Sequence, residues 1–292
     1  MPNLYTISTK NDSIDEDVSE PEKFSIVYHD IFDYPLSFPD LIKWKPGKQL
    51  PTFNYQLSIT TKNGYYFLEG KEGLIYKRIL RERISKKKLE IAKKASRILS
   101  FIPFIKMVAV TGSLSMGNST DESDIDLLVV TKKGLLWTTR AFAYLFICLF
   151  GIKFRRPSDK NQKDKLCLNM WMDECDLVWK KNDRNVYSAH EIGQILPLLN
   201  KNAVYEKFLQ KNRWILEFWP NSVRILGSKN RAKSQKDSSP LSLFLISLER
   251  FACWFQYQHM KSKITRETVT KTRAFFHPQD WGRVVLDRLA QV

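Results

Sequence analysis

Residues 107–131, MVAVTGSLSMGNSTDESDIDLLVVT, are the stretch that decides the fold of this chain. Apolar, largely β-branched residues at both ends and a polar middle rich in glycine and serine predict two buried strands, joined by a turn and a short helical or loop segment. Asp124 and Asp126 stand two apart at the start of the second strand, so their side chains leave the same face, while Ile125 turns the other way into the core. The stretch therefore predicts one polar pocket framed by two strands.

The two aspartates indicate a divalent metal site. Two carboxylates held this close repel each other, and each is pushed toward protonation unless a cation lies between them. Oxygen ligands suit Mg²⁺ or Mn²⁺, which keep several waters and complete their shell with substrate phosphates. Gly112 lets the backbone approach a phosphate, Ser113 supplies a hydroxyl, and the free N–H groups at the start of the next helical segment favour an anion. We expect Gly112, Ser113 and Ser115 to form a phosphate site facing Asp124 and Asp126.

These residues resemble a known signature. Gly112-Ser113, ten intervening residues and Asp124-Ile125-Asp126 at the start of an apolar strand are similar to the motif of the DNA polymerase beta nucleotidyltransferase superfamily. The longer sequence over residues 110–129 resembles that of the small stand-alone members of this superfamily. A surface turn followed by a solvated acidic strand explains either half of the motif, but not both halves at this spacing.

The resemblance implies an activity. A hydroxyl of an acceptor attacks the α-phosphate of a nucleoside triphosphate, often ATP, and pyrophosphate leaves. Gly112 and Ser113 are then expected to hold the β- and γ-phosphates, with Asp124 and Asp126 as the catalytic residues that hold Mg²⁺ or Mn²⁺. The acceptor stays open between a nucleic acid 3′ end, a small molecule and a protein hydroxyl.

Composition sets further bounds. The chain has 292 residues, of which 43% are hydrophobic, so it is long enough for two to three domains with a sizeable core. Its net charge of +16 attracts polyanions such as nucleic acid, nucleotides or anionic lipid headgroups, although solubility alone also accounts for it. The four cysteines have no close paired spacing, so we expect neither a zinc site nor a disulfide framework, and a reducing cytoplasm fits best.

No targeting segment is predicted. Residues 1–22 are rich in polar and acidic residues, so we expect a disordered acidic tail and no signal peptide. The one candidate membrane segment is 135–152. Arg140 within it, Lys153 directly after it, and an uninterrupted apolar run of only about a dozen residues favour a buried core helix. We therefore expect a soluble, cytoplasmic protein without a membrane partner.

Residues 23–84 predict a small N-terminal module. The pattern favours helices at 24–32 and at 37–42, the second capped by Ser37 with Pro39 in its first turn, a weaker third helix at 52–61, and a strand and turn at 64–70. This order resembles a winged helix. Because residues 52–61 contain no lysine or arginine, a docking or structural role is favoured over the reading of bases.

A long basic helix is predicted to lead from this module into the nucleotidyltransferase core, residues 85–180. Apolar residues at helical spacing over residues 72–102 face one way and the cations another, which is typical of a solvated face. The sharper hypothesis is a track for a polynucleotide backbone leading to the active site. Its cations are Arg78, Arg81, Arg83, Lys86, Lys87, Lys88, Lys93, Lys94 and Arg97.

Two residues beyond the motif are further candidates. Arg140, in the apolar helix at 135–150, is expected either to bind nucleotide or to pair with a local carboxylate. Asn169 lies in the strand predicted at 165–172, where the resemblance implies a third carboxylate, and alternation should aim it to the same side as Cys167 and Trp171. An amide oxygen can ligate metal but cannot act as a base. The alternative function is therefore a weak or inactive, nucleotide-sensing regulator that binds nucleic acid.

Residues 181–292 predict a C-terminal helical region with a linker near 227–240. Helices are expected at 187–197, 204–219 and 241–261, with two shorter ones around His277-Pro278. The aromatic residues of 241–261 are expected in the core, and His190 is expected to be structural although it and Glu191 could touch substrate. The predicted fold class is α+β: a small mixed-sheet nucleotidyltransferase core flanked by a winged-helix-like module and this helical region.

Overall fold

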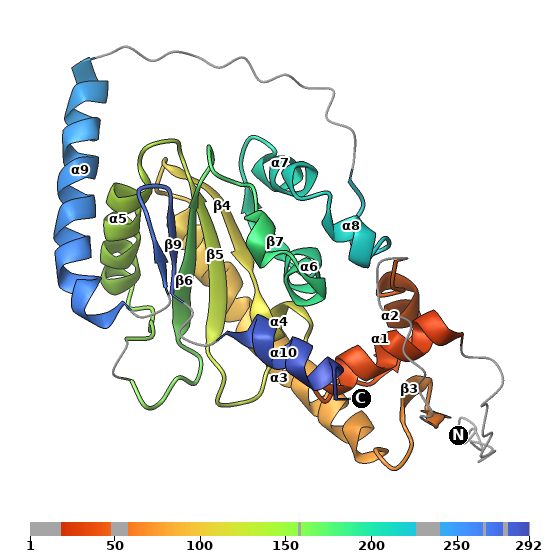
Figure 1. The fold of residues 1–292 in the computed structure, drawn as a ribbon. Coiled ribbons are helices and arrows are strands. Elements are labelled where there is room, and N and C mark those ends of the chain that lie inside the picture. Colours follow the sequence, from red (N-terminus) through yellow and green to blue (C-terminus); the bar gives the residue numbers. More distant parts are fainter. Residues whose placement is uncertain are drawn as a thin grey trace.

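The computed structural model describes residues 19–47, 58–156, 159–225, 240–264, 267–276 and 280–291. Its centre is a six-stranded mixed sheet in the order β7-β4-β5-β6-β9-β8, so the predicted α+β class is confirmed (Figure 1). None of the described helices is long and apolar enough to cross a membrane. The strands are β4 (Ile105–Val110), β5 (Ile125–Thr131), β6 (Leu166–Asp173), β7 (Leu196–Asn200), β8 (Thr268–Val269) and β9 (Arg273–Phe275).

The predicted strand–turn–strand stretch forms the middle of this sheet. Strand β4 pairs antiparallel with β5, with Val108 opposite Val129, and the four-residue helix α4 (Gly112–Ser115) opens the connection between them. Strand β5 in turn pairs parallel with β6. Both middle strands are nearly continuous apolar runs because both of their faces are covered by helices.

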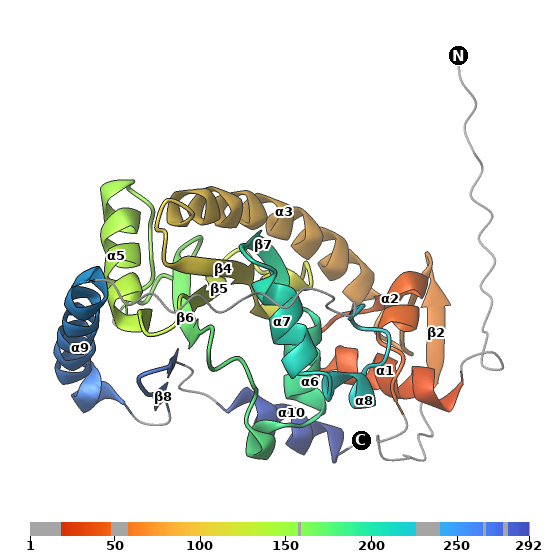
Figure 2. The same ribbon diagram turned by 90° about the horizontal axis from the view of Figure 1, so that it is seen from above.

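Two groups of helices cover the two faces (Figure 2). One face carries Val108 and Val129 and packs against α3 (Gly73–Leu99) and α5 (Leu136–Leu149). The other carries Ala109 and Leu128 and packs with helices from both ends of the chain. These are α1 (Glu20–Asp30), α6 (Val186–Gly193), α7 (Val204–Lys211), α8 (Ile215–Phe218) and α10 (Trp281–Leu289). Asp126 is two residues before Leu128 in β5, so its side chain lies on the same, second face.

The N-terminal part of the chain packs into the hydrophobic core on the second face of the sheet. Helix α2 (Phe38–Lys43) begins where predicted, with Ser37 at its N-cap, and the carboxylate of Asp40 accepts a 3.1 Å hydrogen bond from the backbone N–H of Ser37 and a 2.7 Å one from its hydroxyl. A small antiparallel sheet comes next, formed by β1 (Leu36–Ser37), β2 (Ile59–Lys62) and β3 (Tyr65–Leu68) in the order β1-β3-β2. Of the helix predicted at 52–61, residues 52–57 lie outside the described residues and 59–61 belong to strand β2. The winged-helix assignment stays a prediction.

Helix α3 joins this part to the central sheet without a break. The predicted boundary at residue 84 falls inside it, so the division at that point also stays a prediction. The predicted helix at 72–102 and the predicted helix at 135–150 are confirmed as α3 and α5. The predicted acidic tail lies mostly outside the described residues, as do most of the linker near 227–240 and His277-Pro278.

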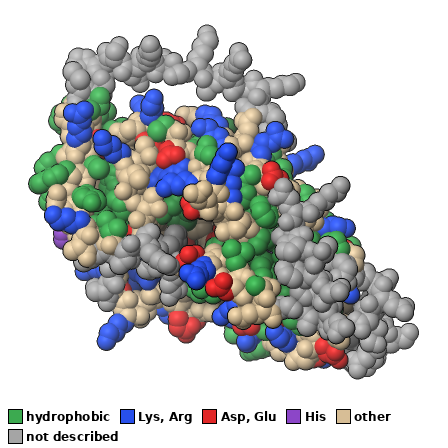
Figure 3. Space-filling model, in the orientation of Figure 1, with side chains coloured by type: hydrophobic (Ala, Val, Ile, Leu, Met, Phe, Trp, Pro, Cys, Tyr) green, Lys and Arg blue, Asp and Glu red, His purple; other side chains and the backbone are tan. Residues whose placement is uncertain are grey.

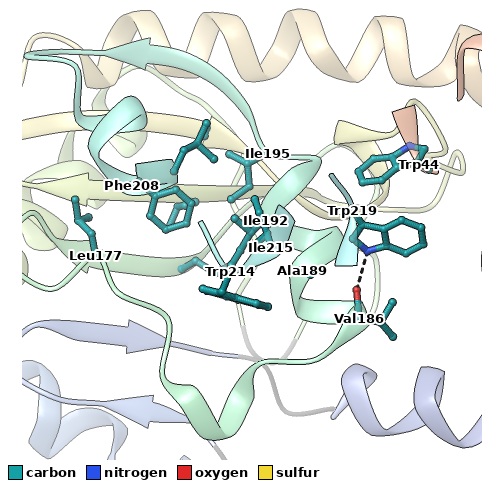
Figure 4. Packing of buried hydrophobic residues seen from close by; sticks show 14 of the residues in the cluster. Trp44, Leu177, Val186, Ala189, Ile192, Ile195, Phe208, Trp214, Ile215 and Trp219 are labelled. Carbon is teal, nitrogen blue, oxygen red and sulfur yellow. Dashed lines mark hydrogen bonds between the residues drawn. The ribbon is translucent and has the colours of Figure 1, made fainter. Parts of the chain in front are cut away.

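The C-terminal region contributes more than helices. It supplies β7 at one side of the sheet and β8 and β9 at the other, where one of two short helices was predicted. It also supplies two tryptophans, Trp214 and Trp219, to the core beside Trp44, and the indole N–H of Trp219 donates a 3.0 Å hydrogen bond to the carbonyl of Val186 (Figure 4). Helix α9 (Pro240–Met260) packs beside α5.

Candidate active site

A bulge in β6 directs Asn169 to the aspartates. Asp126 lies opposite Cys167, yet Leu128, two residues on, lies opposite Met170, so β6 carries one extra residue between these pairs. Met170 accordingly packs in the core cluster of Leu128, while Trp171 packs in the cluster on the opposite face. The expectation that Asn169 and Trp171 share a side is therefore wrong, whereas Asn169 does reach Asp126.

Three side chains lie beside the carboxylate pair. The amide Nδ2 of Asn169 donates a 2.7 Å hydrogen bond to Oδ1 of Asp126. Nη1 of Arg155 donates a 2.8 Å hydrogen bond to Oδ2 of Asp124 and lies 3.9 Å from Sγ of Cys167. Single ligand atoms of Asp124, Asp126 and Cys167 all lie within 4.8 Å of one another. The structure thus brings together the two predicted carboxylates and the predicted amide, and adds Arg155 and Cys167.

Burial makes this cluster electrostatically unusual. It raises the pKa of Asp126 to about 7, and the neighbouring charge of Asp124 acts in the same direction. Burial and both aspartates also raise the pKa of the Cys167 thiol, which keeps that sulfur protonated. A protonated thiol is a poor ligand for a hard cation. The ligand set that remains is made of oxygen atoms.

The glycine of the motif lies against Asp126. Gly112 has a left-handed backbone with φ of +61°, and a Cβ placed there would lie 2.9 Å from Oδ2 of Asp126. Both the conformation and the close approach exclude a larger residue. Ser113 is exposed, while the hydroxyl of Ser115 donates a 2.7 Å hydrogen bond to the carbonyl of Gly112 inside α4. The start of α4 therefore lies against Asp126 at Gly112, and the phosphate-binding role of Gly112, Ser113 and Ser115 stays a prediction.

The residues present suit a divalent metal ion. The carbonyl oxygen Oδ1 of Asn169 is buried and, among the described residues, has no hydrogen-bond partner. An unpaired buried oxygen is costly unless something binds it. Together with the two carboxylates it gives the hard oxygen donors that Mg²⁺ and Mn²⁺ prefer.

Neither acidic residue at the ends of β6 supplies a third ligand. Asp164 accepts a 2.7 Å hydrogen bond from Nζ of Lys88. Asp173 is fully buried at the far end of the strand, where it accepts a 2.5 Å hydrogen bond from the backbone N–H of Gly134. Both carboxylates hold the ends of neighbouring loops in place.

Glu191 is a site residue that the sequence did not connect to the motif. It lies on α6, where burial and then the charge of Asp126 raise its pKa to about 8. Its Oε1 accepts a 2.7 Å hydrogen bond from the side chain of Gln194. Tyr187, one turn earlier on α6, is half-buried, and the charges of Glu191 and Asp126 add to the effect of burial in raising its pKa. Helix α6 thus places a half-buried carboxyl group where the charge of Asp126 acts on it.

The structure does not place Arg140 at this site. Its guanidinium donates a 2.6 Å hydrogen bond to Oε1 of Gln256 on α9 and packs 4.9 Å from the ring of Phe276 and 5.0 Å from that of Tyr144. These rings belong to the core on the α3 and α5 face, opposite to that of Asp126. Sequence reasoning chose Arg140 for its position after β5, yet the helix carries it behind the sheet, so a nucleotide-binding role has no support there.

Fewer cations of α3 than predicted are free to contact a polynucleotide. Arg78 is buried, with a 2.6 Å ion pair to Glu82, and Lys88 donates to the carbonyls of Asp121 and Ser123 as well as to Asp164. Since α3 packs on the face opposite to Asp126, its exposed cations do not lead to the aspartates. These cations are Arg83, Lys86, Lys87, Lys94 and Arg97.

One family comparison bears on this geometry. Residues 78–167 match the family described as nucleotidyltransferase domain. The match includes Gly112, Ser113, Asp124 and Asp126 and ends before Asn169 and Glu191. No curated protein matches the chain.

Proposed function

We propose that this chain, which carries a nucleotidyltransferase domain over residues 78–167, transfers a nucleoside monophosphate from a nucleoside triphosphate to an acceptor hydroxyl and releases pyrophosphate. One observation supports this most: Asp124 and Asp126 converge, the backbone of Gly112 lies against Asp126, and Asn169, which is hydrogen-bonded to Asp126, keeps a buried Oδ1 without a partner among the described residues. An oxygen-ligated cation beside a close-approach glycine is what a triphosphate needs to bind in the correct register.

The proposed metal ligands are Asp124, Asp126 and Asn169, holding Mg²⁺ or Mn²⁺. When bound, such an ion neutralises triphosphate charge and makes the acceptor hydroxyl more acidic. Asp126 must lose its proton for this, and the hydrogen bond from Asn169 favours its ionised form. Gly112 and Ser113 are proposed to bind the β- and γ-phosphates through backbone N–H groups and the Ser113 hydroxyl, with Ser115 keeping the turn of α4 closed.

Glu191 is proposed to take the proton of the acceptor hydroxyl. Asn169 cannot accept a proton, and Asp164 and Asp173 are occupied elsewhere. Glu191 is a half-buried carboxyl group on which the charge of Asp126 acts, and its raised pKa of about 8 suits a base that works near neutral pH. This role accounts for how the site could function with an asparagine on β6.

A direct assay tests the proposal. The protein is incubated with each labelled nucleoside triphosphate and Mg²⁺, with and without total cell RNA, and pyrophosphate release is measured. We expect release that EDTA stops and that the Asp124→Ala, Asp126→Ala double variant lacks, with an unchanged circular dichroism spectrum. Equal release by the double variant would contradict the proposed site. A dependence on added RNA would identify a nucleic acid acceptor, whereas release without RNA points to a small molecule or protein hydroxyl.

The second candidate is a nucleotide-sensing regulator without turnover. Asn169 is the observation that favours it, because a neutral amide replaces a carboxylate beside the metal site. Such a protein would bind nucleoside triphosphate with Mg²⁺ in calorimetry, yet release no pyrophosphate under any of the assay conditions.

A further inference from the structure

Helices α5 and α9 expose large apolar side chains to solvent. Among them are Leu145, Leu149 and Phe150 at α5, and Phe251, Trp254 and Phe255 on α9; these six define the α5–α9 apolar face. Leu149 is 71% exposed and Phe251, Trp254 and Phe255 are 58–60% exposed. This corrects the expectation that the aromatic residues of α9 lie in the core. Soluble monomers rarely expose so many large apolar groups together.

The fold does not need these side chains. Helices α5 and α9 lie side by side at one end of the molecule (Figures 1 and 2), and other residues, including Ala143, Ile147 and Ala252, pack inward. On α9 the ring of Phe251 lies 6.2 Å from that of Trp254 and 6.1 Å from that of Phe255. Figure 3 shows hydrophobic side chains gathered at the α9 end of the visible face. The rings thus form a cluster in which each side chain is more than half exposed.

The charges around this face have one sign. Residues 135–156 contain no carboxylate, and the single one in residues 240–264, Glu249, accepts 2.8 Å hydrogen bonds from the backbone N–H groups of Trp137 and Thr138. Glu249 therefore caps α5 and does not face solvent as a free charge. Exposed cations nearby are Arg250, Lys261 and Lys153. The apolar face has a positive rim without exposed acidic residues in these two segments.

We propose that the α5–α9 apolar face binds the surface of a membrane that contains anionic phospholipid. A helix with aromatic and aliphatic residues on one side and flanking lysine or arginine lies in the interfacial plane, where its rings enter the acyl boundary and its cations meet lipid phosphates. Charge complementarity favours this occupant over a second copy of the chain. A symmetric dimer would bring two positive rims together without carboxylates to pair them.

Vesicle flotation tests this surface separately from nucleotide transfer. The full chain is mixed with vesicles of phosphatidylcholine, either alone or with phosphatidylglycerol. We expect binding to the mixed vesicles that weakens with added salt, and little binding to phosphatidylcholine alone. The Phe251→Ser, Phe255→Ser variant should bind these vesicles at least about tenfold more weakly, because apolar burial is lost. The Arg250→Glu, Lys261→Glu variant should lose the preference for the anionic vesicles.

A matched control is available on α3. Tyr76 and Leu80 are 73% and 44% exposed, and the Tyr76→Ser, Leu80→Ser variant should bind vesicles like the natural chain. All variants should keep the circular dichroism spectrum and the pyrophosphate release of the natural chain, since none alters the proposed site. The proposal is overturned if the natural chain binds neither kind of vesicle, or if the control loses as much binding as the ring variant. It is also overturned if sedimentation shows a dimer that the ring variant dissociates while vesicles remain unbound.

Discussion

Asn169 donates a 2.7 Å hydrogen bond to Asp126 and keeps its own carbonyl oxygen buried and, within the described part of the chain, without a hydrogen-bond partner. The extra residue in β6 makes this contact possible, because it turns Asn169 and Met170 to the same side. The amide helps to keep Asp126 ionised and offers a neutral oxygen to a cation. It cannot take part in proton transfer, so its replacement separates metal binding from catalysis.

Asn169→Asp should strengthen Mg²⁺ binding by about tenfold, because a third negative charge then adjoins Asp124 and Asp126. Without metal, the same charge should raise the pKa values of the carboxyl groups of Asp124 and Asp126. It should also lower the free energy of unfolding by about 1 to 3 kcal/mol. Calorimetric titration with Mg²⁺ and urea unfolding measure the two effects. Asn182→Asp, an exposed position, serves as the control.

The two candidate functions predict different behaviour for this variant. An enzyme should also transfer nucleotides faster with Asn169→Asp, since the new group can both ligate and accept a proton. A nucleotide sensor should gain Mg²⁺ affinity without turnover. Unchanged Mg²⁺ affinity would remove Asn169 from the proposed ligands.

Arg155→Gln should also bind Mg²⁺ several-fold more tightly. In the natural chain the guanidinium pairs with Asp124 at 2.8 Å and competes with a cation for that carboxylate. The adjacent Arg156 is exposed and packs over the ring of Phe154, so Arg156→Gln is the matched control. Equal Mg²⁺ affinities for the two variants would show that the ion pair of Arg155 does not oppose metal binding.

The local part of this site could be predicted from sequence. Gly112 and the Asp124–Asp126 pair belong to one stretch, where strand alternation and turn residues act over a few positions. The strand–turn–strand core, α2 with its Ser37 cap and the long helix α3 arise from the same short-range patterns. Each of these elements is specified by residues that are neighbours in sequence.

The rest depends on contacts between distant residues. No periodicity reveals the bulge in β6, which arises from pairing with β5, or the approach of Glu191 to Asp126 across 65 positions. Strands β8 and β9 are two and three residues long, too short for a pattern. The apolar spacing of α9 indicates a helix that buries one face, but it does not show which rings pack inward. In the structure Phe251 and Trp254 point outward.

Glu191→Gln should slow nucleotide transfer by about 10²- to 10⁴-fold, the range found when a general base is removed. In the natural chain the rate should rise with pH up to about 8, since the carboxyl group of Glu191 has a pKa of about 8 and acts as a base only when ionised. The variant should lose the part of this rise that comes from Glu191 and keep the part below it that comes from ionisation of Asp126, whose pKa is about 7, while its Mg²⁺ affinity stays unchanged. Glu206→Gln on α7 controls for loss of a carboxylate, and a pH profile shared by all three proteins would exclude Glu191 as the base.

Two buried histidines lie in the contact between the N-terminal part and α6. Nε2 of His29 on α1 lies 3.1 Å from Nε2 of His190 on α6, and Trp44 packs 3.9 Å from the His190 ring. Nδ1 of His29 lies 2.7 Å from the carbonyl of Ser25, which can only accept, so this nitrogen carries the proton. In the neutral ring Nε2 of His29 is then the acceptor, and His190 is the donor. The pair is structural, as expected for His190.

Acid should weaken this contact. Burial lowers the pKa of His29 to about 4 and that of His190 well below its usual value, whereas both histidines titrate near 6.5 in the unfolded chain. Below about pH 6.5 the unfolded chain therefore binds more protons, and each histidine should lower the free energy of unfolding by about 1.4 kcal/mol at pH 5.5. The raised pKa values of Asp126 and Glu191 act in the opposite direction, so a variant is needed to isolate the histidines.

His29→Gln provides that comparison, because its amide oxygen can still accept from Nε2–H of His190 while one titrating group is removed. Urea unfolding at pH 7.5 and pH 5.5 gives the loss of stability on acidification for each protein. We expect this loss to be smaller in the variant by about 1.4 kcal/mol, whatever the stability of the variant at pH 7.5. The carboxyl groups of Asp126 and Glu191 are common to both proteins and cancel. An equal loss in the two proteins would mean that His29 is not held neutral by burial between α1 and α6.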